Sequence, residues 1–160
     1  MGQTDLQPAG ESIVVFTLDG QKFGLDIFTV QRALRAVAVT PLPNAPRIVM
    51  GVVNVAGRVL PVFNIRRRLG LAEREVRSSD RLLIAEAGKR TVALLVDAVN
   101  DIAGRDGTTA VAANEILPGF DGIEGVAKLD GGMIFIYNLG KFLSVEEEAS
   151  LGTSLDAAPA

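Results

Sequence analysis

An all-β barrel or sandwich is the fold class that the sequence predicts, and three observations predict it. Apolar residues, mostly Val, Ile and Leu, come in short blocks of the length of a strand. Gly, Asp, Asn and Pro separate these blocks every eight to twelve residues or so, which is typical of all-β proteins. Long amphipathic helical patterns are missing from the 160 residues. This length suits one domain or two small intertwined halves.

The first predicted element is a hairpin. Its strands are residues 13–18 and 22–26. Asp19-Gly20 between them suits a type I′ turn, because both central residues of that turn need positive φ. The chain therefore opens with two antiparallel strands.

A helical turn and an extended connector follow the hairpin. Asp26 can cap a turn over residues 27–30, after which the chain runs on as residues 31–39. Residues 40–46 hold three prolines. We therefore expect an extended connector there and not a central strand.

The middle of the chain predicts two more hairpins and a short helix. Pro61 removes one backbone donor from its ladder, which predicts an edge strand or a bulge there. Residues 65–69 predict a short helix that Gly70 ends. The four strands are residues 48–55 with 58–63, joined at Ala56-Gly57, and residues 81–87 with 90–96, joined at Gly88-Lys89.

The last third of the chain is less regular. Residues 104–120 predict a loop, with one short strand near residues 110–112. A third hairpin turns at Asp130-Gly131-Gly132, between strands at residues 123–129 and 133–137, and residues 138–143 form a helical turn. Residues 144–160 are an acidic tail with one more helical turn and a disordered end, and residues 1–11 are a flexible tail.

Cysteine and histidine are both absent. Their absence excludes disulfides, thiolate nucleophiles and cysteine-ligated zinc, and also histidine as a base, metal ligand or phosphorylation site. We expect no cofactor and no metal. The start of the chain lacks the features of a signal peptide, and no run of about 18 apolar residues occurs. We therefore expect a cytoplasmic protein that does not insert into a membrane.

The net charge of −3 conceals a basic centre. Residues 47–90 carry ten basic and four acidic side chains, so this segment is +6 and the rest is −9. The segment could steer an anionic partner, although a solvated polar face is the simpler interpretation, also for Arg66-Arg67-Arg68. With no Trp and one Tyr there is little stacking surface, so we expect no nucleic-acid partner.

Carboxylates are the acid–base groups that remain once His and Cys are excluded. Asp97 and Asp101 follow apolar runs, and Glu124 lies within another. A carboxylate pair in a barrel mouth would support glycoside chemistry, but turn-capping acids are the simpler interpretation. A small-ligand barrel is a further alternative, with few aromatic residues to line it. The residues favour a binding module with no catalytic residue.

The order of these features resembles the CheW family of bacterial chemotaxis coupling proteins. Residues 13–18, residues 23–27 and Val30-Gln31 are similar to the opening of that family. Pro43, Pro46 and the stretch GVVNVAGRVLPV at residues 51–62 resemble its signature, with Asn54, Gly57 and Pro61 in register, and residues 92–99, 123–126 and 133–143 are similar too.

The resemblance implies two intertwined five-stranded SH3-like β-barrels with short helical turns, over residues 12–143. It implies a non-catalytic adaptor between the cytoplasmic tips of chemoreceptors and the regulatory domain of a CheA-type histidine kinase. Such an adaptor is cytoplasmic and is recruited to membrane-associated receptor clusters. A groove between the barrels suits a receptor helix hairpin, and an edge on another face suits the kinase.

Site residues follow from the resemblance by position. The implied receptor groove contains Ile27, Val30, Ala56, Arg58 and Val99. The implied kinase-facing residues are Gln31, Arg32 and Ala33, and a structural role is implied for Gly51, Asn54, Gly57, Pro61, Asp97 and Gly125.

Three positions depart from the family's pattern. Ala56 stands where an arginine is common, Arg32 where an acid is common, and Asn64 where aspartate is usual. A charge reversal at an interface changes the choice of partner more readily than the fold. We therefore expect a divergent adaptor matched to its own kinase and receptor, with an accessory, non-motility chemosensory pathway as the alternative.

Overall fold

The structure is a computed structural model that describes residues 12–104, 123–129, 132–141 and 145–157. Strands make up most of this part of the chain, with a few short helical elements between and after them. The strands are β1 (Ser12–Leu18), β2 (Gln21–Asp26), β3 (Val30–Arg35), β4 (Val49–Val55), β5 (Arg58–Phe63), β6 (Arg81–Ala87), β7 (Arg90–Val96), β8 (Ala98–Gly104), β9 (Ile123–Leu129) and β10 (Gly132–Tyr137). The helical elements are η1 (Ile27–Thr29), α1 (Ile65–Leu69), η2 (Leu139–Lys141) and α3 (Val145–Ala157).

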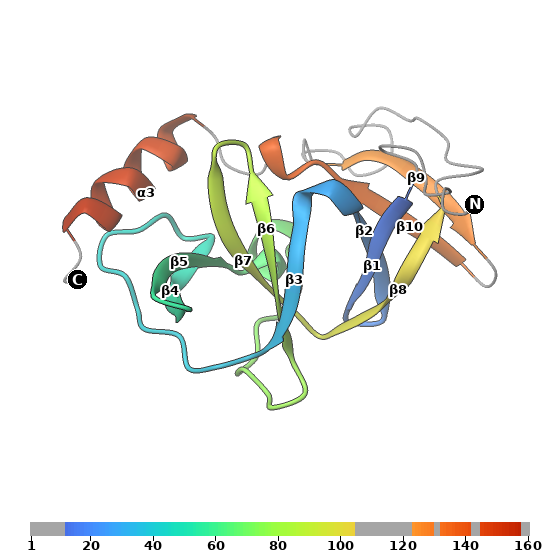
Figure 1. Ribbon diagram of the computed structural model, residues 1–160, viewed down its shortest axis with the longest axis horizontal. Coiled ribbons are helices and arrows are strands. Elements are labelled where there is room, and N and C mark those ends of the chain that lie inside the picture. Colours follow the sequence, from blue (N-terminus) through green and yellow to red (C-terminus); the bar gives the residue numbers. More distant parts are fainter. Residues whose placement is uncertain (1–11, 105–122, 130–131, 142–144, 158–160) are drawn as a thin grey trace.

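The strands form two five-stranded sheets that lie side by side (Figure 1). The central sheet takes one continuous stretch of chain, in the order β3-β6-β7-β5-β4. The terminal sheet takes strands from both ends, in the order β8-β1-β2-β10-β9. The chain thus starts in one sheet, builds the whole of the other and then returns, which confirms the predicted pair of intertwined five-stranded subdomains.

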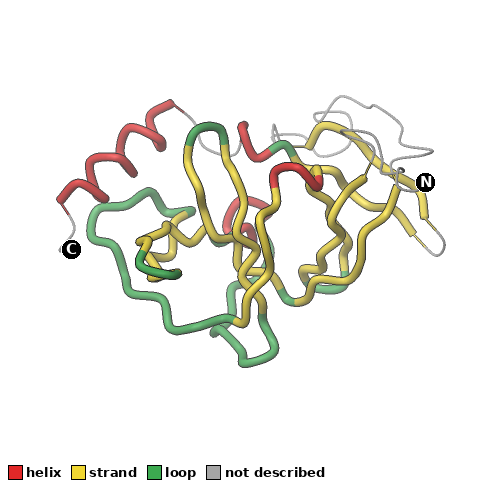
Figure 2. The backbone as a smooth tube through the Cα atoms, viewed as in Figure 1, coloured by secondary structure: helices red, strands yellow, loops and turns green. Residues whose placement is uncertain are grey.

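Each sheet contains one pair of parallel strands. In the terminal sheet β10 pairs in parallel with β2, and in the central sheet β5 pairs in parallel with β7. The other neighbours are antiparallel, including the β1–β2, β4–β5, β6–β7 and β9–β10 hairpins. Figure 2 shows the long connector between β3 and β4, which runs outside the central sheet.

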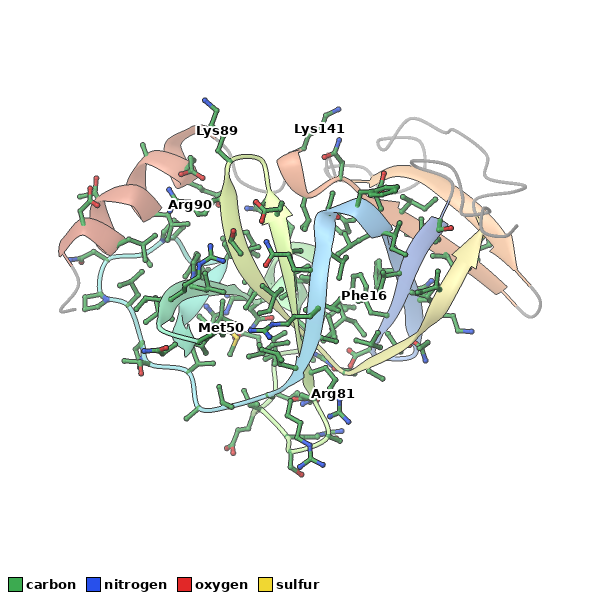
Figure 3. The ribbon with its side chains drawn as sticks, viewed as in Figure 1. Phe16, Met50, Arg81, Lys89, Arg90 and Lys141 are labelled. Carbon is green, nitrogen blue, oxygen red and sulfur yellow. The ribbon has the colours of Figure 1, made fainter. Side chains whose placement is uncertain are left out.

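Several strands bury both of their faces. In β1, Ile13 and Val15 pack with Ile134 and Ile136 inside the terminal sheet, in what we call the terminal core. The alternate residues of β1, including Phe16 (Figure 3), pack instead in a joint core with residues of the central sheet. The joint core contains Val14, Phe16, Leu18, Phe23 and Leu25 from the terminal sheet and Phe63, Leu83, Ala85, Val92 and Leu94 from the central sheet.

The central sheet has the same arrangement. In β6, Leu82 and Ile84 belong to a central core, whereas Leu83 and Ala85 belong to the joint core. Strands buried on both faces need apolar residues at consecutive positions. This explains why the sequence shows short apolar blocks and not a strict alternation of apolar and polar residues.

The predicted turns of the first two hairpins are confirmed by their backbone geometry, whereas residues 130–131 of the last predicted turn lie outside the described residues. Asp19 and Gly20 have φ of 50° and 78°, and Ala56 and Gly57 have φ of 51° and 84°. Asp26 and Asn64 accept hydrogen bonds from the backbone N–H groups of Phe28 and Arg66, so they cap η1 and α1. Gly70 ends α1 with φ of 71°.

Three features of the chain differ from the expectation. The sequence did not predict β8, because Asn100 and Asp101 interrupt its apolar pattern and its pairing with β1 is distant in sequence. Residues 145–157, in the segment expected to hold one helical turn, form α3, a helix of 13 residues, and residues 158–160 lie outside the described residues. Pro61 lies in a strand between two others and not at a bulge, but the pairing of β5 with β7 begins at Val62, so at Pro61 the strand pairs with β4 alone.

Some expectations concern residues that the structure does not describe. The short strand at residues 110–112, most of the loop at 104–120 and the tail at 1–11 lie outside the described residues. Among the described residues, no helix is long and apolar enough to cross a membrane.

Candidate functional site

Asp97 lies at the crossover from the central sheet to the terminal sheet, between β7 and β8. Its carboxylate binds the guanidinium of Arg66 at 2.7 and 2.8 Å and that of Arg74 at 2.6 Å. It also accepts a hydrogen bond of 2.9 Å from the backbone N–H of Asp19, in the β1–β2 turn. Asp97 therefore holds together the turn of one sheet, the helix of the other and the loop after that helix.

The charges around Asp97 form a closed network. Arg66 also binds the Asp19 carboxylate at 2.6 Å, and Arg74 also binds Asp80 at 2.7 Å. Burial alone would raise the pKa of both Asp97 and Asp80. Hydrogen bonds and positive charge outweigh burial, from Arg66 and Arg74 at Asp97 and from Arg74 and Arg77 at Asp80, so the pKa of each carboxyl lies below its usual value.

This network decides between two interpretations of Asp97. Each oxygen of its carboxylate accepts hydrogen bonds from arginine, and Asp80, which is 1% exposed, is equally engaged. A carboxylate held ionised by two arginines is a poor general acid or base near neutral pH. The geometry favours the structural role predicted for Asp97. The side chains of Asp101 and Glu124 lie outside the described residues.

The three consecutive arginines are not a solvated surface. Arg66 is 5% exposed and lies in the network around Asp97. Arg67 binds Glu73 at 2.9 Å, and Arg68 binds Glu147 of α3 at 2.6 Å. The simpler interpretation was wrong here because each arginine has an acidic partner far from it in sequence or in the following loop, which the local pattern does not reveal.

The predicted kinase-facing residues lie together on an edge. Among the described residues β3 pairs with β6 alone, so its other side is open. Gln31, Arg32 and Ala33 are all exposed on this strand. A register shift between Val30 and Arg32 makes Gln31 a bulge, and its amide donates a hydrogen bond to Glu86.

The opposite edge of the central sheet is covered. Thr40 of the β3–β4 connector exchanges two backbone hydrogen bonds with Val52 of β4, at 2.9 and 2.7 Å. Gly51 permits this contact, because a Cβ there would lie 2.1 Å from the carbonyl oxygen of Thr40. An open strand edge invites pairing with another chain, and here β3 is the edge that offers it.

The predicted receptor-groove residues fall into two groups. Ile27, Val30 and Val99 are half-buried and pack against the joint core. Phe28, between Ile27 and Val30 in sequence, is 67% exposed, so an apolar surface is present where η1 meets β3, whereas Val99 pairs with Phe16 farther along β1. Ala56 and Arg58 lie at the β4–β5 turn of the central sheet. Arg58 lines a cavity there, and Ile27, Val30 and Val99 do not line it.

Apart from Pro61, the other predicted structural residues take part in identifiable contacts. Asn54 accepts a hydrogen bond of 2.9 Å from the N–H of Gly57, which closes the β4–β5 turn. Gly125 is buried in β9 opposite Ile136, next to a register shift in that ladder. The hydrogen bond between Asn54 and Gly57 and the close backbone contact at Gly51 support a structural role at these three positions of the signature.

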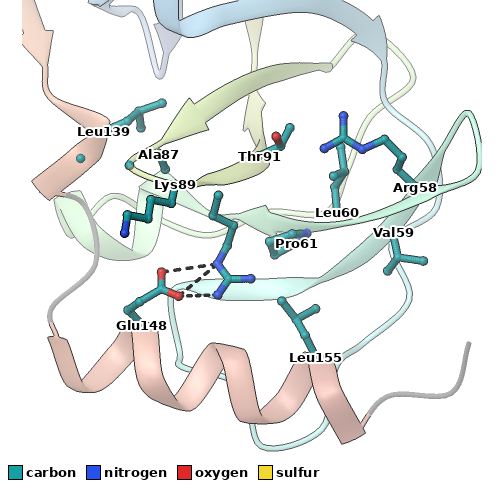
Figure 4. A pocket seen from close by; sticks show the side chains of 13 residues that line it. Arg58, Val59, Leu60, Pro61, Ala87, Lys89, Thr91, Leu139, Glu148 and Leu155 are labelled. Atoms are coloured by element: carbon teal, nitrogen blue, oxygen red, sulfur yellow. Dashed lines mark hydrogen bonds and ion pairs between the residues drawn. The ribbon is translucent and has the colours of Figure 1, made fainter.

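A cavity beside α3 is the feature that the sequence did not predict. It has a volume of about 720 Å³ and lies between β5, the β6–β7 turn, η2 and α3 (Figure 4). Arg58, Lys89 and Arg90 contribute cations to its wall, and Val59, Pro61 and Leu155 contribute apolar surface. The basic balance of residues 47–90 was the signal in the sequence, but α3 was needed to complete the cavity.

Comparisons with known proteins agree with this architecture. A family described as CheW-like domain matches residues 12–147. The chain is 32% identical to a chemotaxis protein CheW of Rhizobium meliloti over 148 residues, which cover 91% of this chain and 96% of that protein. It is 26% identical to a chemotaxis protein CheW of Klebsiella aerogenes, over 89% of this chain and 87% of that one.

The fold is also similar to a solved structure. A crystal structure of the scaffolding protein TtCheW from Thermoanaerobacter tengcongensis superposes with a TM-score of 0.76 and 30% sequence identity. The match covers 89% of this chain and 93% of that one, so both sheets are included.

Proposed function

The chain belongs to the family of CheW-like domains, and from this premise we propose how it couples chemoreceptors to a CheA-type histidine kinase. It is a coupling adaptor of chemotaxis signalling, and its partners are chemoreceptors and CheA in general. The finer assignment is our proposal: it joins the cytoplasmic tip of the receptor to the regulatory domain of the kinase, at receptor clusters, with no catalytic step of its own.

The open edge of β3 carries the proposal for the kinase. Gln31, Arg32 and Ala33 are exposed on a strand that has one free side, whereas the other edge of the same sheet is covered by the connector. A strand edge offers backbone donors and acceptors, and the exposed side chains on it select the partner. These features support β3 as the kinase-facing surface.

The apolar surface beside η1 supports a separate receptor site. Ile27 and Val30 are only half-buried, and the exposed ring of Phe28 lies between them in sequence, while Val99 on β8 is half-buried as well. An amphipathic helix buries its apolar face against such a surface. We therefore assign the receptor tip to this surface and the kinase to the β3 edge.

Arg32 favours a divergent adaptor. It is exposed on the proposed kinase edge and stands where the resemblance leads us to expect an acid. A reversed charge on an interface is repelled by a partner that evolved for the opposite sign. This favours a kinase of its own for this chain, and it keeps the accessory chemosensory pathway as the second candidate.

Titration calorimetry against the regulatory domain of the CheA-type kinase from the same genome tests the proposal. We expect binding by the intact chain and a loss of at least tenfold in affinity with Arg32→Glu, since unfavourable charge placement at an interface costs several kcal/mol and about 1.4 kcal/mol is already tenfold. Lys22→Glu is the matched control, because Lys22 is an exposed cation on β2 of the terminal sheet.

Absence of binding to every CheA-type kinase of that genome would contradict the coupling function and leave the fold intact. Equal losses with Arg32→Glu and Lys22→Glu would contradict the β3 edge as the kinase surface. Tight binding to the kinase of a common motility system would contradict the divergence.

A further inference from the structure

The cavity beside α3 has the size and the shape of a binding groove. Its volume of about 720 Å³ lies within the range of about 300–1,000 Å³ that is usual for ligand sites. Its wall comes from β5, from the β6–β7 turn and from α3, which Figure 4 shows on three sides of the space. The cavity is lined neither by the proposed kinase-facing residues of β3 nor by Ile27, Val30 and Val99.

The cations of this groove outnumber its acids. Arg58, Lys89 and Arg90 line it, against the single carboxylate of Glu148, which already forms an ion pair with Arg90. Among the described residues, no ion pair is formed by Arg58 or by Lys89, and both are exposed. Figure 3 shows Lys89 at the end of the β6–β7 turn, directed away from the sheet.

Between the cations the groove is apolar. Val59 is 48% exposed, and Leu60, Pro61 and Leu155 lie beside it in the wall. A small anion would use the cations and leave this surface uncovered. A segment with carboxylates and aliphatic side chains on one face would use both.

The chain's own helix α3 demonstrates the mode of binding. Its Glu147 pairs with Arg68 at 2.6 Å and its Glu148 pairs with Arg90, so two consecutive carboxylates meet two arginines of the central half. One turn later Leu151 is fully buried in the joint core, and Leu155 follows at the next turn. The central half therefore already binds one acidic amphipathic helix through arginines and leucines.

We propose that the groove binds a second acidic amphipathic helix, supplied by a partner and packed beside α3. Carboxylates of the partner pair with Arg58 and Lys89, and its aliphatic side chains cover Val59, Pro61 and Leu155. Arg58, which the resemblance assigned to the receptor groove, thus belongs to a third surface. The inference does not depend on the kinase edge, since the two surfaces share no residue.

Fluorescence anisotropy with a labelled peptide tests this directly. The probe is a helical peptide of about 16 residues with Glu pairs followed by Leu four residues later, and its counterpart replaces every Glu by Gln. We expect the full chain to bind the Glu peptide with micromolar affinity and the Gln peptide at least tenfold more weakly. Arg58→Glu combined with Lys89→Glu should weaken binding of the Glu peptide at least tenfold.

Controls separate this surface from charge in general. Lys22→Glu makes a matched single reversal on the terminal sheet and should leave the peptide affinity within twofold. Amide shifts in an NMR titration should cluster at residues 58–60 and 87–91. The melting temperature of the double variant should match that of the parent chain, because neither side chain forms an ion pair with a described residue.

Three results would overturn the proposal. The first is no binding of the Glu peptide, the second is equal binding of the Gln peptide, and the third is full displacement by inorganic phosphate at 10 mM, which would make the groove a site for small anions. The kinase titration is unaffected by any of them, so failure here is distinguishable from failure of the coupling function.

Discussion

Asp97 shows how one side chain can join two subdomains. Its carboxylate contacts arginines from α1 and from the following loop, and it accepts the N–H of Asp19 in the other sheet. Arg66, whose side chain is 7% exposed, shares its charge compensation between Asp97 and Asp19, and Arg74 shares its own between Asp97 and Asp80. Loss of the Asp97 charge would leave each arginine with one acidic partner in place of two.

We expect Asp97→Asn to lower the free energy of unfolding at pH 7 by about 1.5–3 kcal/mol, the range for loss of a hydrogen bond to a charged group. The folded-state pKa of Asp97 lies below the unfolded value of 3.8. Its contribution to stability is therefore present above about pH 4 and is lost as the pH falls through the lower, folded value. Urea unfolding from pH 7 to pH 2 should show a smaller loss of stability for the variant than for the parent.

Glu73→Gln is the control for this measurement. Glu73 pairs with Arg67 at the surface, where its side chain is 44% exposed, and such pairs contribute little. If Asp97→Asn and the parent lose stability in parallel on acidification, the role assigned to Asp97 is wrong.

At the scale of elements, α3 is the least expected part of the fold. It follows the terminal sheet in the chain, yet it lies against the central half, at the end of the molecule away from β8 and β9 (Figure 1). Leu151 has 0% exposure in the joint core, Ser154 is buried too, and Leu155 packs against the same core. Among the described residues, the attachment of α3 thus depends on a short apolar stripe and two ion pairs.

Leu151→Ala should lower the free energy of unfolding by about 2–4 kcal/mol, since it removes a fully buried leucine from the core. Denaturant unfolding measures this loss, and amide exchange of residues 145–157 reports whether the helix separates first. Thr153→Ala is the control, because Thr153 is exposed on the same helix. Equal effects of the two substitutions would show that α3 is not part of the cooperative core.

The elements also show what the sequence could predict. The hairpin turns at Asp19-Gly20 and Ala56-Gly57 were predicted because a turn of two residues carries its own signal. Strand β8 and helix α3 were missed because both depend on distant contacts: β8 on its pairing with β1, and α3 on Leu151 and the arginines. The network around Asp97 joins residues up to 78 positions apart, which no local pattern encodes.

At the scale of the molecule, the joint core makes the two sheets one unit. Phe16 and Phe23 of the terminal sheet stack with ring centroids 5.8 Å apart, and both pack in the same cluster as Leu83 and Leu94 of the central sheet. Neither sheet can separate without exposing this surface to water. The resemblance predicted two intertwined barrels, but the extent of the shared core required the structure.

We therefore expect unfolding in a single transition. Tyr137, the one tyrosine of the sequence, lies buried in the joint core on β10 and reports on the terminal sheet by fluorescence. Its transition in urea should coincide with that of far-ultraviolet circular dichroism. Leu83→Ala, on β6 of the central sheet, should move both midpoints by the same amount, and two separate midpoints would contradict a shared core.

The sheet order also has a consequence for synthesis on the ribosome. The first hairpin emerges early, but its neighbours β8 and β10 follow the whole central sheet in the chain. The central sheet is contiguous from β3 to β7 and is complete before either neighbour has been made. In the nascent chain, the hairpin β1–β2 therefore has no strand neighbour on either side while the central half folds. The terminal sheet forms last, packed against a central half that is already folded.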